Sequence, residues 1–309
     1  MSFVAWLPAL LGGFHYDDLH SIVNNPYISS LVSSGDPTKV MIRPGLMVTY
    51  WIDHHLGSWH LTNLMIHLAN GLLRPAMLVH PICAEPVNYI SARSESLSLL
   101  CCLLAVRVWP SRWAWVVVAV GMTVKETALT IPLILLATFP GDWRRMWPAL
   151  GLWGGWWAVA GSWAEKAVFV RGPWEQLATQ TKGLMWYAWK VAFPANLSVD
   201  PQFQAGFGPE VLLSGLCFAS LLVVWRPPLL LWMLPTFIMP LNILVSEKRA
   251  YVLAALFPRM PKAVTVVFAV LALLRTLEWQ SDLRLWQTAV DRGSSSRSHI
   301  FLGQALRER

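Results

Sequence analysis

Apolar runs separated by short polar turns fill the sequence almost from end to end, and this pattern limits the possible folds more than any other feature. Over the chain, 55% of the residues are hydrophobic and only 13% are charged, whereas an average soluble domain has about 25% charged residues. This excludes a disordered tail, a soluble nucleic-acid binder and an ordinary cytosolic enzyme. We therefore expect an all-α, polytopic integral membrane protein.

The apolar runs predict about eleven membrane spans, because one span needs roughly 20 apolar residues. They are expected near 1–14, 56–73, 75–82, 95–108, 112–124, 127–141, 146–163, 210–225, 228–245, 250–258 and 262–276. The first run is interpreted as a span and not as a removable signal peptide, since no basic segment precedes it and no small-residue cleavage site follows it. A further apolar stretch, 183–194, is expected to lie in the membrane interface.

Two of these runs, 75–82 and 250–258, are too short to cross a bilayer alone. Unsatisfied backbone ends cannot lie in lipid. We therefore expect the chain near 73–80 and 256–263 to show either spatial breaks or half-helices packed inside protein.

The net charge of +7 is assigned to cytoplasmic turns that face anionic lipid, and no nucleic-acid partner is expected. The short basic turns are expected at the cytoplasmic face; they carry Arg74, Arg107, Arg112, Arg144, Arg145, Arg226, Arg259 and Lys262. The longer loops of mixed charge are expected at the opposite face; they carry Asp17, Glu85, Lys125 and Glu247. This arrangement puts the N-terminus inside and the C-terminus outside.

The cysteines and histidines do not predict a metal site. Cys83, Cys101, Cys102 and Cys217 all lie in apolar stretches, without zinc or disulfide spacing, and are interpreted as packing residues. His60 and His67 share one helical face, but no carboxylate stands at ligand spacing as in an H-E-x-x-H helix. Structural histidines are therefore favoured here, and also at His54 and His55.

Two adjacent carboxylates, Asp17 and Asp18, open the large first external loop, 15–43, which is expected to contain interfacial helices. Carboxylates at the mouth of a membrane helix are energetically expensive and indicate function. Either could act as a general base on a hydroxyl acceptor. The alternative is that Asp18 caps the helix that follows it.

Three more charged clusters are expected on the same face. They are His80 with Glu85 and the Arg93-Ser94-Glu95 run, then Lys125-Glu126, and then Glu247-Lys248-Arg249. Their cations could hold a phosphate leaving group. The alternative for each cluster is internal ion pairing, Lys125 with Glu126 and Glu247 with Arg249. Their common face with Asp17 favours a site.

In order along the chain, these motifs resemble the membrane domain of the C-type glycosyltransferases. The resemblance is to the cadherin-directed protein O-mannosyltransferases with tetratricopeptide tails and to their bacterial relatives. The elements that carry it are Tyr16-Asp17-Asp18, Asn25-Pro26-Tyr27-Ile28, Arg43-Pro44, Thr49-Tyr50, His60-Leu61-Thr62-Asn63, His67, Asn70, His80-Pro81, Glu85, Arg93-Ser94-Glu95, Lys125-Glu126, the 194–200 run and the 246–251 run. The chain departs from the family in having short connections where a full hairpin usually stands, as between Asn70 and His80.

The resemblance implies a glycosyltransferase that moves a mannose-like sugar from a polyprenyl-phosphate donor to a protein Ser or Thr hydroxyl. Asp17 or Asp18 would be the base, with Asp17 preferred because it is nearer to the membrane helix. Arg93, Lys125 or Arg249 would neutralise the departing phosphate. His80, Glu85, Glu126 and Glu247 would support these groups. No resident cofactor or metal is assigned.

The resemblance also suggests where the domains and the active face lie. Residues 1–276 would form the membrane domain, and 277–309 a short external tail similar to the start of a tetratricopeptide array, with Leu283, Trp286 and Val290 on one amphipathic helical face. The expected setting is a bacterial inner membrane with the active face on the periplasmic side. The rival interpretation is a degenerate relative that serves as a structural subunit beside other membrane subunits.

Overall fold

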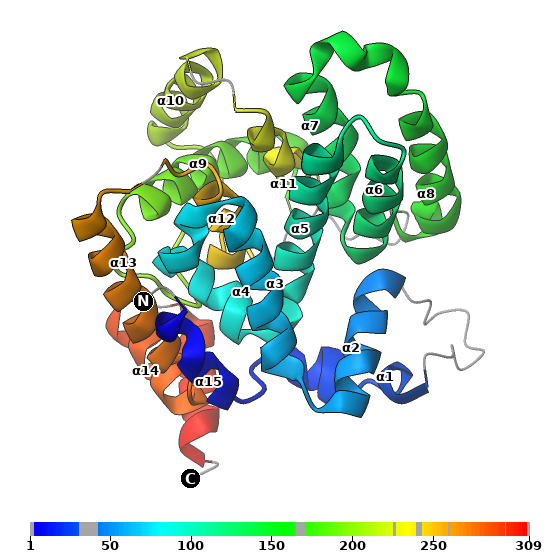
Figure 1. Ribbon diagram of the computed structural model, residues 1–309. Helices are drawn as coiled ribbons and strands as arrows, with labels where there is room; N and C mark the ends of the chain where they lie inside the picture. The colour runs from blue at the N-terminus through cyan, green and yellow to red at the C-terminus, as the bar shows by residue number, and fades with distance from the viewer. Residues whose placement is uncertain are drawn as a thin grey trace.

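The computed structural model describes residues 3–30, 43–164, 171–224, 227–238, 243–258, 260–293 and 295–307. All regular secondary structure within these ranges is helical (Figure 1), so the all-α prediction is confirmed. Arg226 and Arg259, which were expected in cytoplasmic turns, lie outside the described residues.

The α helices differ widely in length. They are α1 (Tyr27–Ser30), α2 (Pro44–Leu56), α3 (Trp59–Leu73), α4 (Ala84–Asn88), α5 (Arg93–Val108), α6 (Trp113–Val124), α7 (Ile131–Thr138), α8 (Pro148–Ala164), α9 (Pro173–Ala192), α10 (Glu210–Val224), α11 (Leu234–Ile238), α12 (Glu247–Ala254), α13 (Lys262–Glu278), α14 (Asp282–Asp291) and α15 (Ser296–Arg307). Shorter elements lie between them. They are the 3₁₀ helices η1 (Val4–Leu11), η3 (Pro75–Val79), η4 (Pro81–Cys83), η5 (Ile90–Ala92), η6 (Glu126–Thr130), η7 (Pro140–Arg145) and η8 (Pro228–Met233), and the π-helical turn η2 (Leu19–Val23).

The eleven expected spans do not appear as eleven long helices. Within the described ranges, no single helix combines the length and the apolar composition needed to cross a bilayer. Two consecutive pairs reach that length together, Pro81–Asn88 with Ile90–Val108 and Lys262–Glu278 with Asp282–Asp291, but they bend by 107° and 117°. The stretch expected in the interface, 183–194, is instead the second half of α9.

The short run at 75–82 folds back against α3 and does not form a span. Pro75 and Pro81 each begin a 3₁₀ helix, and Met77 and Val79 are buried. The close return depends on Gly71 of α3, where an added Cβ would lie 2.1 Å from the Leu78 side chain. This is the half-helix packed inside protein that the sequence predicts here.

Helices α5 and α6 form an antiparallel hairpin that places two charged groups at one end of the core. Gly121 allows the close approach, since an added Cβ there would lie 3.1 Å from the Cβ of Cys101. Lys125, which follows α6, forms an ion pair with Glu95 in the first turn of α5. The last turn of α5, which carries Arg107, and the α5–α6 turn that follows it are therefore about 20 Å from this pair, at 1.5 Å rise per residue.

The C-terminal helices α14 and α15 pack on each other and on the start of the chain (Figure 1). The boundary expected at residue 277 falls inside the last turn of α13, which continues to Glu278. The buried face of α14 is formed by Leu285, Trp286 and Ala289. The expected face was Leu283, Trp286 and Val290. Of these three residues only Trp286 is buried, so the buried face is rotated about the helix axis from the expected one.

Candidate functional site

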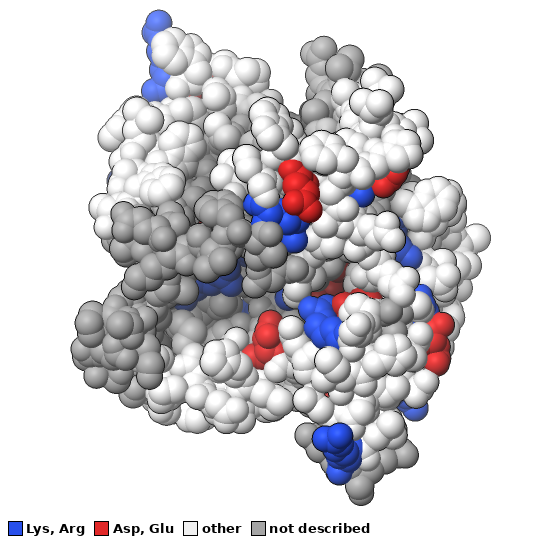
Figure 2. Space-filling view, turned by 180° about the vertical axis from the view of Figure 1, so that it is seen from behind, with Lys and Arg blue, Asp and Glu red and all other residues white. Residues whose placement is uncertain are grey.

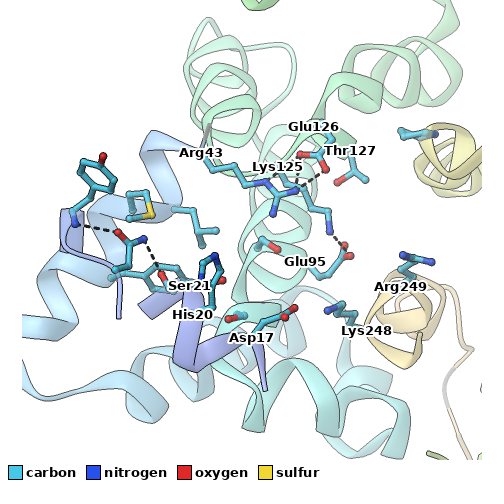
Figure 3. Close-up of a pocket in the computed structure, with 18 of the residues that line it drawn as sticks. Asp17, His20, Ser21, Arg43, Glu95, Lys125, Glu126, Thr127, Lys248 and Arg249 are labelled. Atoms are coloured by element: carbon cyan, nitrogen blue, oxygen red, sulfur yellow. Dashed lines mark hydrogen bonds and ion pairs between the residues drawn. The ribbon is translucent and has the colours of Figure 1, made fainter. Parts of the chain in front are cut away.

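A pocket of about 830 Å³ opens where η2, α2, α5, η6, α11 and α12 meet. Figure 3 shows its charged side chains pointing inward from these separate elements. Its described lining is Asp17, His20, Ser21, Asn24, Asn25, Pro26, Tyr27, Arg43, Leu46, Met47, Tyr50, Ser91, Ser94, Glu95, Lys125, Glu126, Thr127, Trp232, Met233, Pro235, Thr236, Lys248 and Arg249. In Figure 2, charged side chains gather around a hollow in a face whose described surface is otherwise mostly uncharged.

The two adjacent carboxylates of the first loop have different surroundings. Asp17 lines the pocket and is partly exposed, and no cation among the described residues lies within ion-pair distance of it. Asp18 is fully buried behind it. Asp17 is therefore the carboxylate that a bound molecule can reach.

Asp18 joins the first loop to η5. Its Oδ1 accepts hydrogen bonds from the backbone N–H (2.7 Å) and the hydroxyl (2.6 Å) of Ser91, and its Oδ2 accepts from the N–H of His15 at 3.2 Å. Burial raises the pKa of Asp18, against the lowering effect of these hydrogen bonds. Asp18 precedes η2 but makes no side-chain cap to it, so the capping interpretation was wrong.

Asp18→Asn is expected to destabilise the fold. Both oxygens of Asp18 accept hydrogen bonds, so an amide nitrogen in either orientation would face N–H donors. Lost partners of buried donors cost about 1–3 kcal/mol each. Thermal unfolding followed by tryptophan fluorescence should show a lower midpoint than wild type, and a midpoint equal to wild type would contradict this structural role.

Two cations of the pocket are already paired with carboxylates. Arg43 contacts Glu126 with two nitrogens, the closer at 2.7 Å. Lys125 pairs with Glu95, and not with Glu126 as the alternative interpretation held. Burial raises the pKa of Glu126, but Arg43 and Lys125 outweigh it and hold that pKa below its usual value. Burial lowers the pKa of Lys125, although Glu95 opposes the shift.

The other two cations, Lys248 and Arg249, have no such partner. Among the described residues, no carboxylate lies within ion-pair distance of either. Arg249 Nη1 donates to the carbonyl oxygen of Ile243 at 2.8 Å, and Lys248 Nζ lies 5.0 Å from the centre of the Tyr89 ring. These two side chains bring positive charge to the pocket that no carboxylate of the described chain neutralises.

Arg93, a predicted phosphate ligand, does not line the pocket. Its guanidinium is fully buried and forms an ion pair with the equally buried Asp53, at 2.5 Å between Nη2 and Oδ2. It also donates to Asn63 Oδ1 at 2.6 Å and to the carbonyl oxygen of Trp59 at 2.8 Å. The structure therefore places Arg93 in the join between α2, α3 and α5.

The predicted supporting residues, apart from Glu126, lie behind the pocket wall. Glu85 accepts a hydrogen bond from the N–H of Lys248 at 2.8 Å and from the Ser246 hydroxyl. Glu247 pairs with Arg275 of α13 at 3.1 Å, not with Arg249 as the alternative held. Both carboxylates thereby fix the start of α12, which carries Lys248 and Arg249 into the pocket.

His80 also has a structural environment. Its Nε2 contacts the carbonyl oxygen of Val191 at 2.9 Å, and its Nδ1 accepts a hydrogen bond from the N–H of Ile82 at 3.2 Å. The expected packing role of Cys83, Cys101 and Cys102 agrees with their burial, and Cys217 is partly exposed.

Lys248, Arg43 and Glu95 line the pocket but were not among the predicted site residues. Lys248 and Glu95 each lie in a charged motif that the sequence shows, and Arg43 stands in the Arg43-Pro44 motif. The available signal was adjacency, because Lys248 stands between Glu247 and Arg249. Which side of a helix faces a pocket depends on contacts that are distant in sequence, and periodicity alone did not identify it.

Comparison of the chain with protein-family models, with curated protein sequences and with solved structures gave no match.

Proposed function

We propose that the chain is a membrane glycosyltransferase that moves a sugar from a polyprenyl-phosphate donor to a Ser or Thr hydroxyl of a protein. The observation that carries the proposal is the pocket itself. Of the described residues that line it, the carboxylate Asp17 has no cation within ion-pair distance, and the cations Lys248 and Arg249 have no carboxylate within that distance. Its volume of about 830 Å³ lies within the range of small-molecule sites.

The charged groups suit the two ends of a glycosyl phosphate. A phosphate diester carries one negative charge, which Lys248 and Arg249 would attract without first breaking an ion pair. The paired cations Lys125 and Arg43 also line the pocket and contribute a weaker positive field, because Glu95 and Glu126 offset them. Apolar side chains from α2, η8 and α11 also line the pocket and offer the donor surface without charge; they are Leu46, Met47, Trp232, Met233 and Pro235.

In the proposed reaction, Asp17 takes the proton of the acceptor hydroxyl as the oxygen attacks the anomeric carbon. A bond forms between the acceptor oxygen and that carbon, and the bond between that carbon and the phosphate oxygen breaks. The electron pair leaves on the phosphate, where Lys248 and Arg249 stabilise it. One direct displacement of this kind inverts the anomeric configuration.

The proposed setting is a bacterial inner membrane, with the pocket on the periplasmic face. It rests on the apolar composition and on the pocket's position at the Lys125 end of the α5–α6 hairpin, opposite the arginine-bearing turn. Reconstitution in lipid vesicles with a His20→Cys variant tests the orientation, because His20 lines the pocket and is exposed. An impermeant maleimide should label that cysteine only from the side opposite the turn that carries Arg112. Labelling from the same side as that turn would contradict the proposed orientation.

Lys248→Gln and Arg249→Gln are each expected to weaken donor binding by about 10- to 100-fold, since a hydrogen bond to a charged group contributes about 1.5–3 kcal/mol. Binding of a polyprenyl phosphate to purified protein, measured by calorimetry in detergent, checks this. Lys262→Gln is the matched control, because Lys262 is exposed at the start of α13 and does not line the pocket. Equal affinities for polyprenyl phosphate in all three variants would show that Lys248 and Arg249 do not bind the phosphate.

A further inference from the structure

The two residues before Asp17 are held by the C-terminal part of the chain. His15 is buried, with Nδ1 at 2.5 Å from Asp282 Oδ1 and Nε2 at 2.7 Å from the carbonyl oxygen of Trp279. Both ring nitrogens thus face oxygen atoms of the α13–α14 junction. The imidazole therefore ties the backbone next to the pocket to a segment more than 260 positions away in sequence.

Tyr16 has a backbone conformation that tyrosine rarely adopts. Its φ is +47°, in the left-handed region that favours glycine. Such a conformation persists only where the surroundings hold it. Here the Tyr16 ring packs edge-on against Phe301 of α15, at 5.0 Å between centroids, and against Trp286 of α14, at 6.1 Å.

The hairpin that holds Tyr16 is itself anchored to the body of the protein. Asp200 accepts a hydrogen bond from the Ser298 hydroxyl at 2.7 Å and pairs with Arg297. Arg292 pairs with Glu278 at the end of α13, at 2.5 Å. The connection between α14 and α15 is therefore joined to Glu278 and Asp200, and the hairpin can act as a fixed support for Tyr16.

We infer that the α14–α15 hairpin positions Asp17 in the pocket, through His15 and the strained backbone of Tyr16. The inference rests on the proposed role of Asp17 as the base. A third contact acts in the same direction, because the N–H of Asp17 donates to the Tyr89 hydroxyl at 3.2 Å and the Tyr89 ring stacks on Trp279. His15, Tyr16 and Phe301 are thus positioning residues, and none of them lines the main pocket.

Phe301→Ala tests this directly, because it removes the ring that packs on Tyr16 from a position remote from the pocket. We expect the backbone amides of residues 16–19 to exchange hydrogen at least about 10-fold faster in the full-length protein. The kcat of transfer should fall about 10- to 100-fold with the KM for donor unchanged, since small displacements of a reacting group cost rates of this size. Phe301→Tyr keeps the ring and should restore both quantities.

Ile300→Ala is the control, because Ile300 is the neighbouring residue and is 60% exposed. It should leave exchange and kcat at their wild-type values. Asp282→Asn is the second variant should Phe301→Ala fail to fold; it weakens the His15 contact at a half-buried site and is expected to shift both readouts in the same direction.

The outcomes separate the two proposals. Wild-type protein that binds no donor and transfers no sugar would overturn the proposed function, and with it the role of Asp17. Unchanged exchange at residues 16–19 in both variants would overturn the positioning inference alone, whatever the activity. A fall in kcat that Phe301→Tyr does not restore would also contradict it.

Discussion

Asparagine in place of Asp17 is expected to lower the rate of sugar transfer by about 10²–10⁴-fold, the usual contribution of a general base. The change keeps the shape of the side chain and removes its charge. Because no cation among the described residues lies within ion-pair distance of Asp17, the fold should not depend on that charge. Transfer from a polyprenyl-phosphate donor to a Ser/Thr peptide by purified protein measures the rate.

The thermal unfolding midpoint and the affinity for donor should stay close to wild type in Asp17→Asn. This separates it from Asp18→Asn, in which activity should fall together with stability. Full activity in Asp17→Asn would contradict the assignment of Asp17 as the general base. Full stability with lost activity in Asp18→Asn would reverse the two roles.

Methionine in place of Arg93 is expected to destabilise the protein by about 3–5 kcal/mol, because removing one partner of a buried ion pair leaves an uncompensated charge. Arg93 and Asp53 are both fully buried, so the carboxylate left behind has no access to water. Chemical denaturation in detergent, followed by the fluorescence of the protein's 19 tryptophans, gives the change in unfolding free energy.

The double variant Arg93→Met with Asp53→Asn is the control. It removes the remaining charge and should recover part of the lost stability, which a double-mutant cycle quantifies. Single and double variants of equal stability would contradict the buried pair. The donor affinity of properly folded Arg93 variants should be unchanged, since Arg93 does not line the pocket.

The helical class could be predicted from the sequence, but the continuity of the helices could not. An apolar run in the sequence indicates that a segment avoids water, but it does not show whether that segment is one straight helix or several short ones. The run expected at 127–141 contains the 3₁₀ helix η6, then α7, which ends at Thr138, and then the start of η7. Pro132 stands in the first turn of α7 and Pro140 in that of η7, where a missing N–H and a fixed φ favour a new start.

The candidate site was partly visible in the sequence. Asp17, Lys125 and Arg249 stand in polar segments between apolar runs, which predicts one common face, and the structure places them at one pocket. Arg93 was expected beside them. Its partner Asp53 is forty positions earlier in the chain, and a buried pair of this kind can be recognised only once α2 and α5 are packed together.

The alternative of an ion pair between Lys125 and Glu126 was wrong for a similar reason. Neighbours in sequence, such as Lys125 and Glu126, point in different directions when a helix begins between them. Glu126 starts η6 and turns to Arg43, while Lys125 turns to Glu95. Exposed ion pairs between adjacent residues are weak, so pairs between packed elements replace them.

Transfer of a labelled sugar from a polyprenyl-phosphate donor to a Ser/Thr peptide, by wild-type protein in lipid nanodiscs, is the most direct test of the proposed function. The account predicts a glycosylated peptide of inverted anomeric configuration, release of polyprenyl phosphate, and loss of both in Asp17→Asn. A wild-type protein that neither binds the donor nor releases polyprenyl phosphate would contradict the account and favour a structural subunit of a larger membrane complex.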